Sequence, residues 1–170
     1  ALPISGIAAL ESLGTEHEFD VVATEDASVF SDEGLSPFDV IVFLNTTGDV
    51  LNEAQQDAME RFIAAGKGFV GIHSAADTEY NWDWYEEAIG AHFDNHPEIQ
   101  SAQLIIEDRV HPATSHLDLR WERTDEWYAF RRNPRGDVHV LISLNEQSYS
   151  GGTMGYDHPW AWCNETAGGR

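Results

Sequence analysis

Basic residues are scarce in this chain. Its 170 residues include 9 lysines and arginines against 30 aspartates and glutamates, and the formal net charge is −21 at pH 7. A surface this acidic repels phosphate backbones and anionic lipid headgroups, so we expect neither nucleic acid nor a membrane as a partner. The acidic residues are scattered rather than grouped. This pattern fits a solvated acidic surface, such as a saline habitat favours, better than a tract that attracts cations.

Cysteine and long apolar runs are almost missing as well. Cys163 is the only cysteine, so no intrachain disulfide and no cysteine-based zinc site can form. No apolar stretch approaches the roughly 20 residues that span a bilayer. The chain also has no HExxH, P-loop or dinucleotide-binding fingerprint. The cysteine usage favours a cytoplasmic protein, although export stays open because the chain starts at Ala1 rather than Met.

The remaining composition predicts one globular domain over residues 1–170. Apolar residues make up 42% of the chain, which suffices for a core, and the sequence contains no repeat, linker or low-complexity tract. Helix-like and strand-like segments alternate, which is typical of an α/β protein with a doubly wound, mostly parallel sheet between helices. The periodicity predicts helices over 3–13, 52–65 and 82–89, and strands over 19–23, 38–44, 68–72, 99–107, 138–144 and 160–163. The aromatic-rich stretch 119–130 is expected to form one or two strands.

Local signals mark the ends of these elements. Gly14 is expected to end the first helix and Gly90 the third. Asn52 and Gln55 have the spacing of a capping box at the start of the second helix. The strand over 38–44 is nearly all apolar, so we expect burial on both of its faces.

Both ends of the chain are expected to be incomplete. The first helix starts almost at once, without a strand before it, and residues 168–170 have the composition of a hairpin turn without a returning strand. A doubly wound sheet that lacks its terminal strands would expose edges in its middle. We therefore expect the chain to be a fragment of a longer protein.

The most informative stretch follows the apolar strand over 68–72. That strand ends at His73, and the small residues Ser74, Ala75 and Ala76 come next. In open α/β sheets, reactive groups lie where a strand ends and the chain turns toward a helix, and nucleophile-elbow enzymes hold Ser or Cys there. The stretch predicts an active-site elbow in which His73 replaces the nucleophile. A serine hydrolase using Ser74 is a weaker hypothesis, because Ser74 comes one residue later and lacks a Gly-x-Ser-x-Gly context.

Histidines of the second half are candidate acid/base groups or metal ligands. His96 lies in a loop, four residues after His92, and this spacing alone decides little. His111 precedes a proline in a polar loop, where it serves either the loop or a site. His158 follows Asp157 in a Gly-rich region, where it either transfers protons or binds the backbone. The residues alone leave these alternatives open.

A carboxylate stands beside aromatic residues at Glu126, Trp127 and Tyr128. Sugar sites often combine such groups, because rings stack on the pyranose and carboxylates bind its hydroxyls. The alternative is an exposed strand edge whose aromatic residues pack on the core. The spacing does not decide between the two.

Several motifs occur together, in one order, along nearly the whole chain. They are Gly-Ile-His-Ser-Ala-Ala-Asp at 71–77, His96-Pro97, Glu107-Asp108-Arg109 with His111-Pro112, Thr-Asp-Glu-Trp-Tyr at 124–128, and Tyr-Ser-Gly-Gly-Thr-Met-Gly at 149–155 followed by Asp157-His158-Pro159 and Trp162. With these motifs the chain resembles the ThuA-like (trehalose utilisation) family of the class I glutamine amidotransferase-like superfamily. The resemblance implies a flavodoxin-like sheet flanked by helices, with additional elements before the first helix and after Arg170.

The resemblance also implies a role in carbohydrate metabolism. Family members look linked to the breakdown of trehalose and related disaccharides, alongside oxidoreductases that make keto-sugars. By resemblance, His73 takes the place of the amidotransferase nucleophile. Imidazole has no thiolate chemistry, so glutamine hydrolysis is not expected.

We therefore expect an enzyme that acts on a small-molecule sugar or keto-sugar, of isomerase, lyase or hydrolase type. A keto-sugar has acidic hydrogens beside its carbonyl, and a histidine–carboxylate site suits their removal. Two histidines and a glutamate also suit a divalent metal, and the candidate ligands are the three catalytic candidates. The expected catalytic residues are His73, Glu126 and His158, and the expected substrate-binding residues are Trp127, Tyr128, His96, His111 and Asp157.

The rival hypothesis is a non-catalytic carbohydrate-binding domain with a vestigial elbow. The 6 tryptophans and 5 tyrosines are enough to line a groove for a sugar. The sequence leaves the identity of the sugar, the presence of a metal and the formation of a homo-oligomer open.

Overall fold

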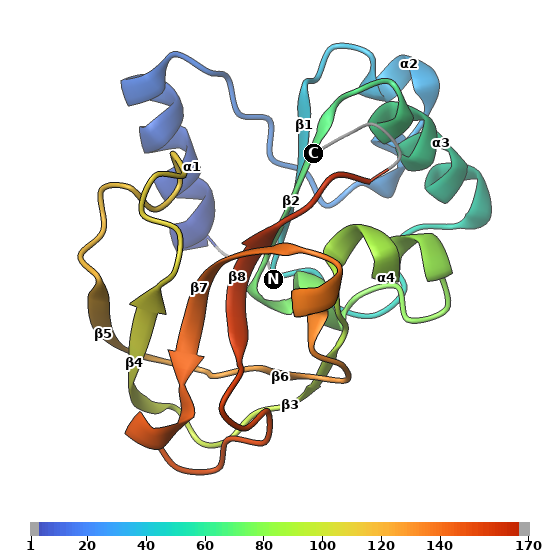
Figure 1. Ribbon diagram of the computed structural model, residues 1–170. Coiled ribbons are helices and arrows are strands. Elements are labelled where there is room, and N and C mark those ends of the chain that lie inside the picture. The colour runs from blue at the N-terminus through green and yellow to red at the C-terminus, as the bar shows by residue number, and fades with distance from the viewer. Residues whose placement is uncertain (1–3, 167–170) are drawn as a thin grey trace. The chain divides into compact units, whose positions relative to one another are not determined.

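The computed structural model describes residues 4–166. These residues form two compact units, the first ending at Asn81 and the second running from Trp82 to Thr166. Each unit has its own helices and strands (Figure 1). The single domain over 1–170 stays a prediction, and the hairpin turn predicted at 168–170 lies outside the described residues.

The helix α3 (Glu53–Ala64) begins as its sequence signal predicts. The capping box of α3 is confirmed: Asn52 Oδ1 accepts the Gln55 amide at 3.1 Å, and Gln55 Oε1 accepts the Asn52 amide at 2.8 Å. Such a cap contributes about 1 kcal/mol to a helix. The helices are α1 (Ile4–His17), α2 (Asp32–Leu35) and α3 (Glu53–Ala64), with short 3-10 helices η1 (Ala27–Val29) and η2 (His73–Asp77).

Gly14 does not end α1, so that prediction was wrong. The helix continues to His17, and the chain then folds back so that the Phe19 amide donates to the Gly14 carbonyl at 3.0 Å. A β-carbon on Gly14 would lie 2.5 Å from the Phe19 carbonyl oxygen, so glycine is needed here for close approach. The strand predicted over 19–23 does not form, and its Val22 is 67% exposed.

The strands of the first unit are β1 (Val40–Leu44) and β2 (Gly68–Ile72), which pair in parallel with Leu44 opposite Ile72. The predicted strand over 68–72 is thus confirmed. Because the carboxyl ends of parallel strands meet at one edge, the residues after Leu44 and Ile72 lie next to each other.

Burial on both faces of β1 was predicted and is wrong. Ile41 and Phe43 are buried, whereas Val40 and Val42 are 48% and 38% exposed. The buried face packs aromatic rings, because Phe43 meets Phe69 edge to face at a centroid distance of 5.3 Å. One face of this strand pair therefore builds the core of the first unit.

The second unit contains a four-stranded antiparallel sheet with the strand order β5-β4-β7-β8. The strands predicted over 99–107, 138–144 and 160–163 are confirmed within one or two residues, and the stretch 119–130 forms two strands. Elements of this unit are α4 (Asp83–Ile89), β3 (Phe93–Asn95), β4 (Gln100–Ile106), β5 (Arg120–Asp125), β6 (Ala129–Phe130), η3 (Pro134–Gly136), β7 (His139–Asn145), η4 (Glu146–Ser148) and β8 (Pro159–Cys163).

The core of the second unit is built on alternating residues of β4 and on β7. Leu104 and Ile106 are almost fully buried, while their neighbours Gln103 and Ile105 are half-buried. Trp127 packs into the same cluster and donates its indole N–H to the Gln100 carbonyl at 2.8 Å. Burial of such side chains stabilises the sheet by about 2 kcal/mol each.

The architecture is mixed α/β, and the predicted doubly wound, mostly parallel sheet is not confirmed. Among residues 4–166, parallel pairing joins β1 to β2 and Gly48 to Thr78, and the other strand pairs are antiparallel. In the second half, loops such as 107–119 connect the strands instead of helices, and such connections permit antiparallel pairing.

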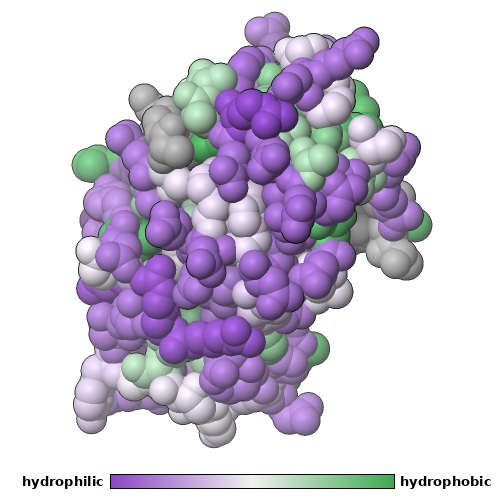
Figure 2. All heavy atoms as spheres, turned by 90° about the vertical axis from the view of Figure 1, so that its right-hand side faces the viewer, coloured by the Kyte–Doolittle hydropathy of each residue, from purple (hydrophilic) through white to green (hydrophobic). Residues whose placement is uncertain are grey.

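Charged and polar side chains dominate the face that Figure 2 displays. The net charge of −21 requires such hydrophilic residues at the surface. Within the described range 4–166, no helix combines the length and the apolar character needed to cross a membrane.

Candidate functional site

His73 occupies a strained turn at the carboxyl end of β2. Its φ is +56°, in the left-handed region that non-glycine residues rarely adopt, and η2 begins at this residue. Such a backbone costs about 1 kcal/mol or more, and it persists at sites where the surrounding structure holds it in place. His73 is also exposed. The predicted elbow geometry, a sharp strand-to-helix turn that presents a side chain, is therefore confirmed.

Asn45 stands at the corresponding position after β1. Its φ is +55°, and its amide donates to the Ile72 carbonyl at 3.2 Å, so Asn45 lies beside His73 at the same edge of the strand pair. An exposed amide side chain next to an imidazole offers both a donor and an acceptor to a bound molecule. The sequence analysis missed Asn45. Its signal was a polar residue directly after an apolar strand.

Hydrogen bonds from hydroxyl groups stabilise the elbow segment after β2. Asp77 accepts hydrogen bonds from the hydroxyl of Thr47 and, at 2.6 Å, from that of Tyr80. The hydroxyls of Thr46 and Thr78 lie 2.9 Å apart and link the same two segments. These contacts tie the turn after β1 to the turn after β2. We define the elbow site by Asn45, Thr47, His73, Asp77 and Tyr80.

A buried glutamate fixes the end of the elbow segment. Glu79 is 1% exposed, and its carboxylate accepts the amides of Val50 and Leu51 at 2.7 Å each and the side-chain amide of Gln56 at 2.8 Å. A buried carboxylate with three donors is a satisfied structural group. Glu79 therefore anchors the elbow segment to the loop before α3 and to α3 itself.

A second cluster forms in the other unit around His96. His96 Nε2 lies 3.4 Å from Glu126 Oε1, and the imidazole stacks on the Tyr128 ring at a centroid distance of 5.9 Å. Phe93 packs on Tyr128 from 4.2 Å. The side chains of His96 and Glu126 remain 39% and 26% exposed, so solvent reaches the pair. We call His96, Glu126 and Tyr128 the aromatic–acid site.

The aromatic–acid site combines predicted residues in a new pairing. Glu126 was expected to act with His158, whereas His96 Nε2, from the loop after β3, lies 3.4 Å from its carboxylate. His96 was expected only to bind substrate. This pairing depends on how β3 meets β6, and sequence spacing carries no information on that contact.

The structure does not support sugar stacking by Trp127, and we correct that prediction. Its side chain is 0% exposed and packs among core residues, 6.1 Å from the Trp160 ring. Because its neighbours in the chain alternate in direction, Trp127 faces the core while Glu126 and Tyr128 stay accessible. Trp127 therefore packs on the core, which was the alternative to a sugar site in the sequence analysis.

His158 is a fully buried histidine, and both of its ring nitrogens have partners. Nδ1 lies 2.9 Å from Glu146 Oε1, and Nε2 lies 2.9 Å from the Tyr128 carbonyl oxygen. In this arrangement neither nitrogen faces solvent. The role of His158 as a direct proton donor has no support from its position, whereas a role in holding Tyr128 does.

Asp157 is held in an ion-pair network rather than presented to a ligand. Arg135 bridges Asp157 and Glu107, with N–O distances of 2.6 and 2.7 Å. The guanidinium lowers the pKa of both carboxyls below their usual values, chiefly through these hydrogen bonds. The predicted substrate-binding role of Asp157 gains no support from these contacts.

His111 lies at the end of the sheet opposite to Glu126. In the β4–β5 register, Gln100 pairs with Asp125 at one end and Ile105 with Arg120 at the other, and the loop of His111 follows the second end. There His111 Nδ1 accepts the Ala113 amide at 3.2 Å. The loop alternative fits this placement better than a shared site with Glu126.

Asp108 and His139 form a further pair beside that loop. Asp108 Oδ2 lies 2.7 Å from His139 Nε2, and the other oxygen accepts the amides of Val110 and His111. These bonds lower the pKa of Asp108 to about 2, with His139 as the largest cause. The His139 side chain, which begins β7, is 59% exposed.

The predicted metal ligands do not form a metal site among the residues that the structure describes. Within the second unit, His96 Nε2 lies 3.4 Å from Glu126 Oε1, and Glu146 Oε1 lies 2.9 Å from His158 Nδ1. No group of three or more His, Cys, Asp or Glu side chains in the described range 4–166 is arranged to hold a metal ion.

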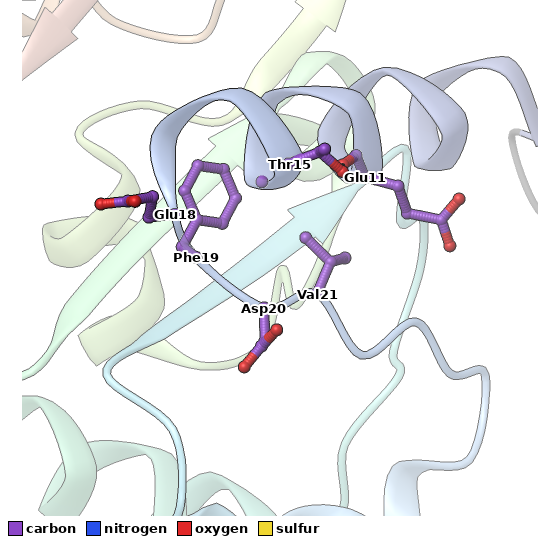
Figure 3. A pocket seen from close by; sticks show the side chains of 7 residues that line it. Glu11, Thr15, Glu18, Phe19, Asp20 and Val21 are labelled. Carbon is purple, nitrogen blue, oxygen red and sulfur yellow. The ribbon is translucent and has the colours of Figure 1, made fainter.

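A shallow hollow beside the end of α1 is a weaker candidate (Figure 3). Thr15, Phe19 and Val21 line its middle, while the carboxylates of Glu11 and Glu18 point away from each other. Carboxylates that diverge cannot share a ligand. We assign this hollow no function.

Comparison with known proteins identifies the family. The model of the ThuA family, described as trehalose utilisation, matches residues 3–170. The chain belongs to the ThuA family. The resemblance seen in the sequence motifs is thereby confirmed, and the comparison with curated proteins found no match.

Two crystal structures of ThuA-like proteins are similar to this ThuA-family chain. One, from Bacteroides uniformis, is 29% identical with a TM-score of 0.82, over 95% of this chain and 69% of that one. The other, from Parabacteroides merdae, is 19% identical with a TM-score of 0.73, over 96% and 71%, and shows the fold alone. The mixed α/β architecture is therefore shared with ThuA-like proteins.

Proposed function

We propose that this ThuA-family chain is an enzyme of carbohydrate metabolism that acts on a sugar or keto-sugar through His73. The observation that carries the proposal is the strained, exposed His73 at the carboxyl end of β2. The end of a parallel strand is where open α/β sheets place reactive groups. The family, described as trehalose utilisation, supports a sugar as the substrate class. It also supports a flavodoxin-like arrangement around β1 and β2.

The chemistry that suits this site is proton transfer beside a carbonyl. A neutral ring nitrogen of His73 accepts the proton from the carbon next to the keto group, and the C–H electron pair becomes the C=C bond of an enediolate while the carbonyl oxygen takes the charge. The imidazolium then returns the proton to carbon. Asn45, beside His73, is placed to donate its side-chain N–H to the sugar oxygens. Glutamine hydrolysis is not proposed, because no thiol or hydroxyl nucleophile stands at position 73.

The aromatic–acid site has the chemistry of a sugar-binding site. The Glu126 carboxylate can accept hydrogen bonds from sugar hydroxyls, and the Tyr128 ring offers a face for a pyranose. His96, ion-paired with Glu126, adds an acid/base group. Hydrogen bonds from sugar hydroxyls to a carboxylate contribute about 1.5–3 kcal/mol each.

Product analysis with trehalose and its keto form tests the enzymatic proposal. We expect the wild-type protein to convert the keto form and His73→Ala to lose about 10²- to 10⁴-fold in rate, since this is the usual contribution of a general base. Circular dichroism confirms that the variant is folded. Equal rates in the two proteins would overturn the role of His73.

A non-catalytic carbohydrate-binding domain is the second candidate. The observation that favours it is the stacked, solvent-accessible pair of His96 and Tyr128 beside a carboxylate. Calorimetry with the same two sugars separates the candidates. Binding that Glu126→Gln weakens, without any conversion by the wild-type protein, would favour the binding domain over the enzyme.

A further inference from the structure

Glu146 is the centre of a hydrogen-bond network in the Gly-rich loop of the second unit. Its Oε1 accepts the amide of Met154 at 2.7 Å, and its Oε2 accepts the amide of Gly155 at 2.6 Å. The hydroxyl of Tyr149 donates to Oε1 at 3.4 Å. Burial, reinforced by this carboxylate, raises the pKa of Tyr149 above its usual value. One side chain, only 11% exposed, thus organises residues 149–155.

The loop is packed so tightly on Glu146 that a side chain at position 152 would have to displace the carboxylate or the Tyr149 hydroxyl. A β-carbon there would lie 2.6 Å from Glu146 Cδ and 2.7 Å from the Tyr149 hydroxyl. Such distances are far below van der Waals contact. The position of the carboxylate and the path of the loop therefore determine each other.

The same loop packs against Pro97 and Gln100, which flank the turn that carries His96. Gly151, with φ of +89°, approaches Pro97 so closely that a β-carbon would lie 2.8 Å from Pro97 Cβ. Ser150 exchanges two hydrogen bonds with the side chain of Gln100, at 2.9 and 3.0 Å. The turn that carries His96 is thus braced by the loop that Glu146 holds.

Glu146 also reaches Tyr128 through His158. The Tyr128 carbonyl can only accept, so His158 Nε2 carries a proton, and His158 Nδ1 shares one with Glu146 Oε1. The chain of contacts runs from a buried carboxylate through a buried imidazole to the backbone of Tyr128. Two of the three residues of the aromatic–acid site, His96 and Tyr128, are therefore connected to Glu146.

We propose that Glu146 is a positioning residue for the aromatic–acid site, acting through the loop 149–155 on His96 and through His158 on Tyr128. The expected effect on sugar binding rests on the proposed function. The geometric part, that Glu146 sets the stacking of His96 on Tyr128, stands by itself. It also assigns His158 a supporting role in place of direct catalysis.

The test replaces the carboxylate by an amide of the same shape. In Glu146→Gln one of the two acceptor atoms becomes a donor that faces a backbone amide, so Met154 or Gly155 loses its partner. We expect hydrogen exchange of that amide to accelerate by at least about tenfold, the effect of roughly 1.4 kcal/mol. We also expect the nuclear Overhauser contacts between the rings of His96 and Tyr128 to weaken.

Two matched variants and one independent variant sharpen this test. Glu122→Gln makes the same chemical change on the exposed face of β5 and should leave exchange and ring contacts as in the wild type. Gly152→Ala keeps the carboxylate but pushes it aside, and should weaken the same ring contacts. Gly136→Ala, which has open space around the new methyl group, is its control.

The outcomes separate this inference from the proposed function. Unchanged exchange at Met154 and Gly155 in Glu146→Gln, or faster exchange with intact His96–Tyr128 contacts, would overturn the positioning role. Weakened contacts together with weaker trehalose binding would support both proposals. Weakened contacts in a protein whose wild type binds no trehalose would support the positioning role and count against the proposed function.

Discussion

At the scale of single residues, the elbow is defined by backbone strain that two neighbouring positions share. Asn45 and His73 follow adjacent parallel strands, and both have positive φ values. Both side chains carry a β-carbon that crowds the following carbonyl in this conformation, which costs about 1 kcal/mol or more. A residue that keeps a costly conformation while exposed to solvent gains little from its packing. We infer that its side chain is retained for function.

A stability comparison at position 73 measures this strain. Glycine adopts positive φ without the steric cost of a β-carbon, so we expect His73→Gly to exceed His73→Ala by about 1 kcal/mol in free energy of unfolding. Urea denaturation of the two variants gives this difference. A His73→Gly protein that is no more stable than His73→Ala would contradict the strain.

The Asp108 carboxyl makes stability depend on pH in the acid range. Its pKa falls from 3.8 to about 2 in the folded protein, so it adds stability above about pH 4 that is lost as the pH falls toward 2. The unfolding free energy of the wild type should therefore drop more steeply over this window than that of Asp108→Asn. Asp118→Asn, at an exposed position, is the control and should keep the steep slope.

Only part of the candidate sites was predictable from the sequence. The elbow at His73 was predictable, because a strand end and a run of small residues are both local signals. The His96–Glu126 pair and the hub at Glu146 were not, because they depend on how β3 meets β6 and how the loop 149–155 folds back. Such contacts join residues that are far apart in the chain.

At the scale of elements, local chemistry predicted helix ends better than strand arrangement. The capping box at Asn52 and the glycine after α4 are set by neighbouring residues, and both are as expected. The order of helix-like and strand-like segments suggested a parallel sheet, yet the second half pairs antiparallel. Gly14 misled for a similar reason, because its partner Phe19 is brought close only by the fold.

Two glycines of α1 provide a matched test of that last point. Alanine in a helix interior normally gains about 1 kcal/mol over glycine. Gly6→Ala meets only the movable end of the Leu44 side chain, at 3.1 Å, and should gain part of this amount. Gly14→Ala meets the Phe19 carbonyl at 2.5 Å and should be destabilising. Thermal unfolding of both variants measures these changes in stability. A stabilising Gly14→Ala would contradict the close approach of Gly14 to the Phe19 carbonyl.

At the scale of the whole molecule, the net charge of −21 opposes the folded state through self-repulsion. Raising NaCl from about 0.01 M to about 1 M shortens the Debye length from about 30 Å to about 3 Å. We expect the Tm at pH 7 to rise over this range, by about 2–4 °C for each kcal/mol of repulsion removed. The same salt series near the pI of 4.4, where the net charge vanishes, should change the Tm little. A salt-independent Tm at pH 7 would contradict this account.

The family assignment and the two candidate sites also belong to this scale. The ThuA match covers residues 3–170, so it includes residues of both units. One unit carries a strained histidine and the other a histidine–glutamate pair beside an aromatic ring.

Proton exchange on a keto-sugar in D2O tests the central claim most directly. If His73 removes the hydrogen beside the carbonyl, the wild-type protein introduces deuterium at that carbon of the keto form of trehalose, which proton NMR follows as loss of signal. We predict that His73→Ala, folded as judged by circular dichroism, does so at least about 10²-fold more slowly. Equal exchange rates in the two proteins, or no exchange above background with the wild type, would contradict the account.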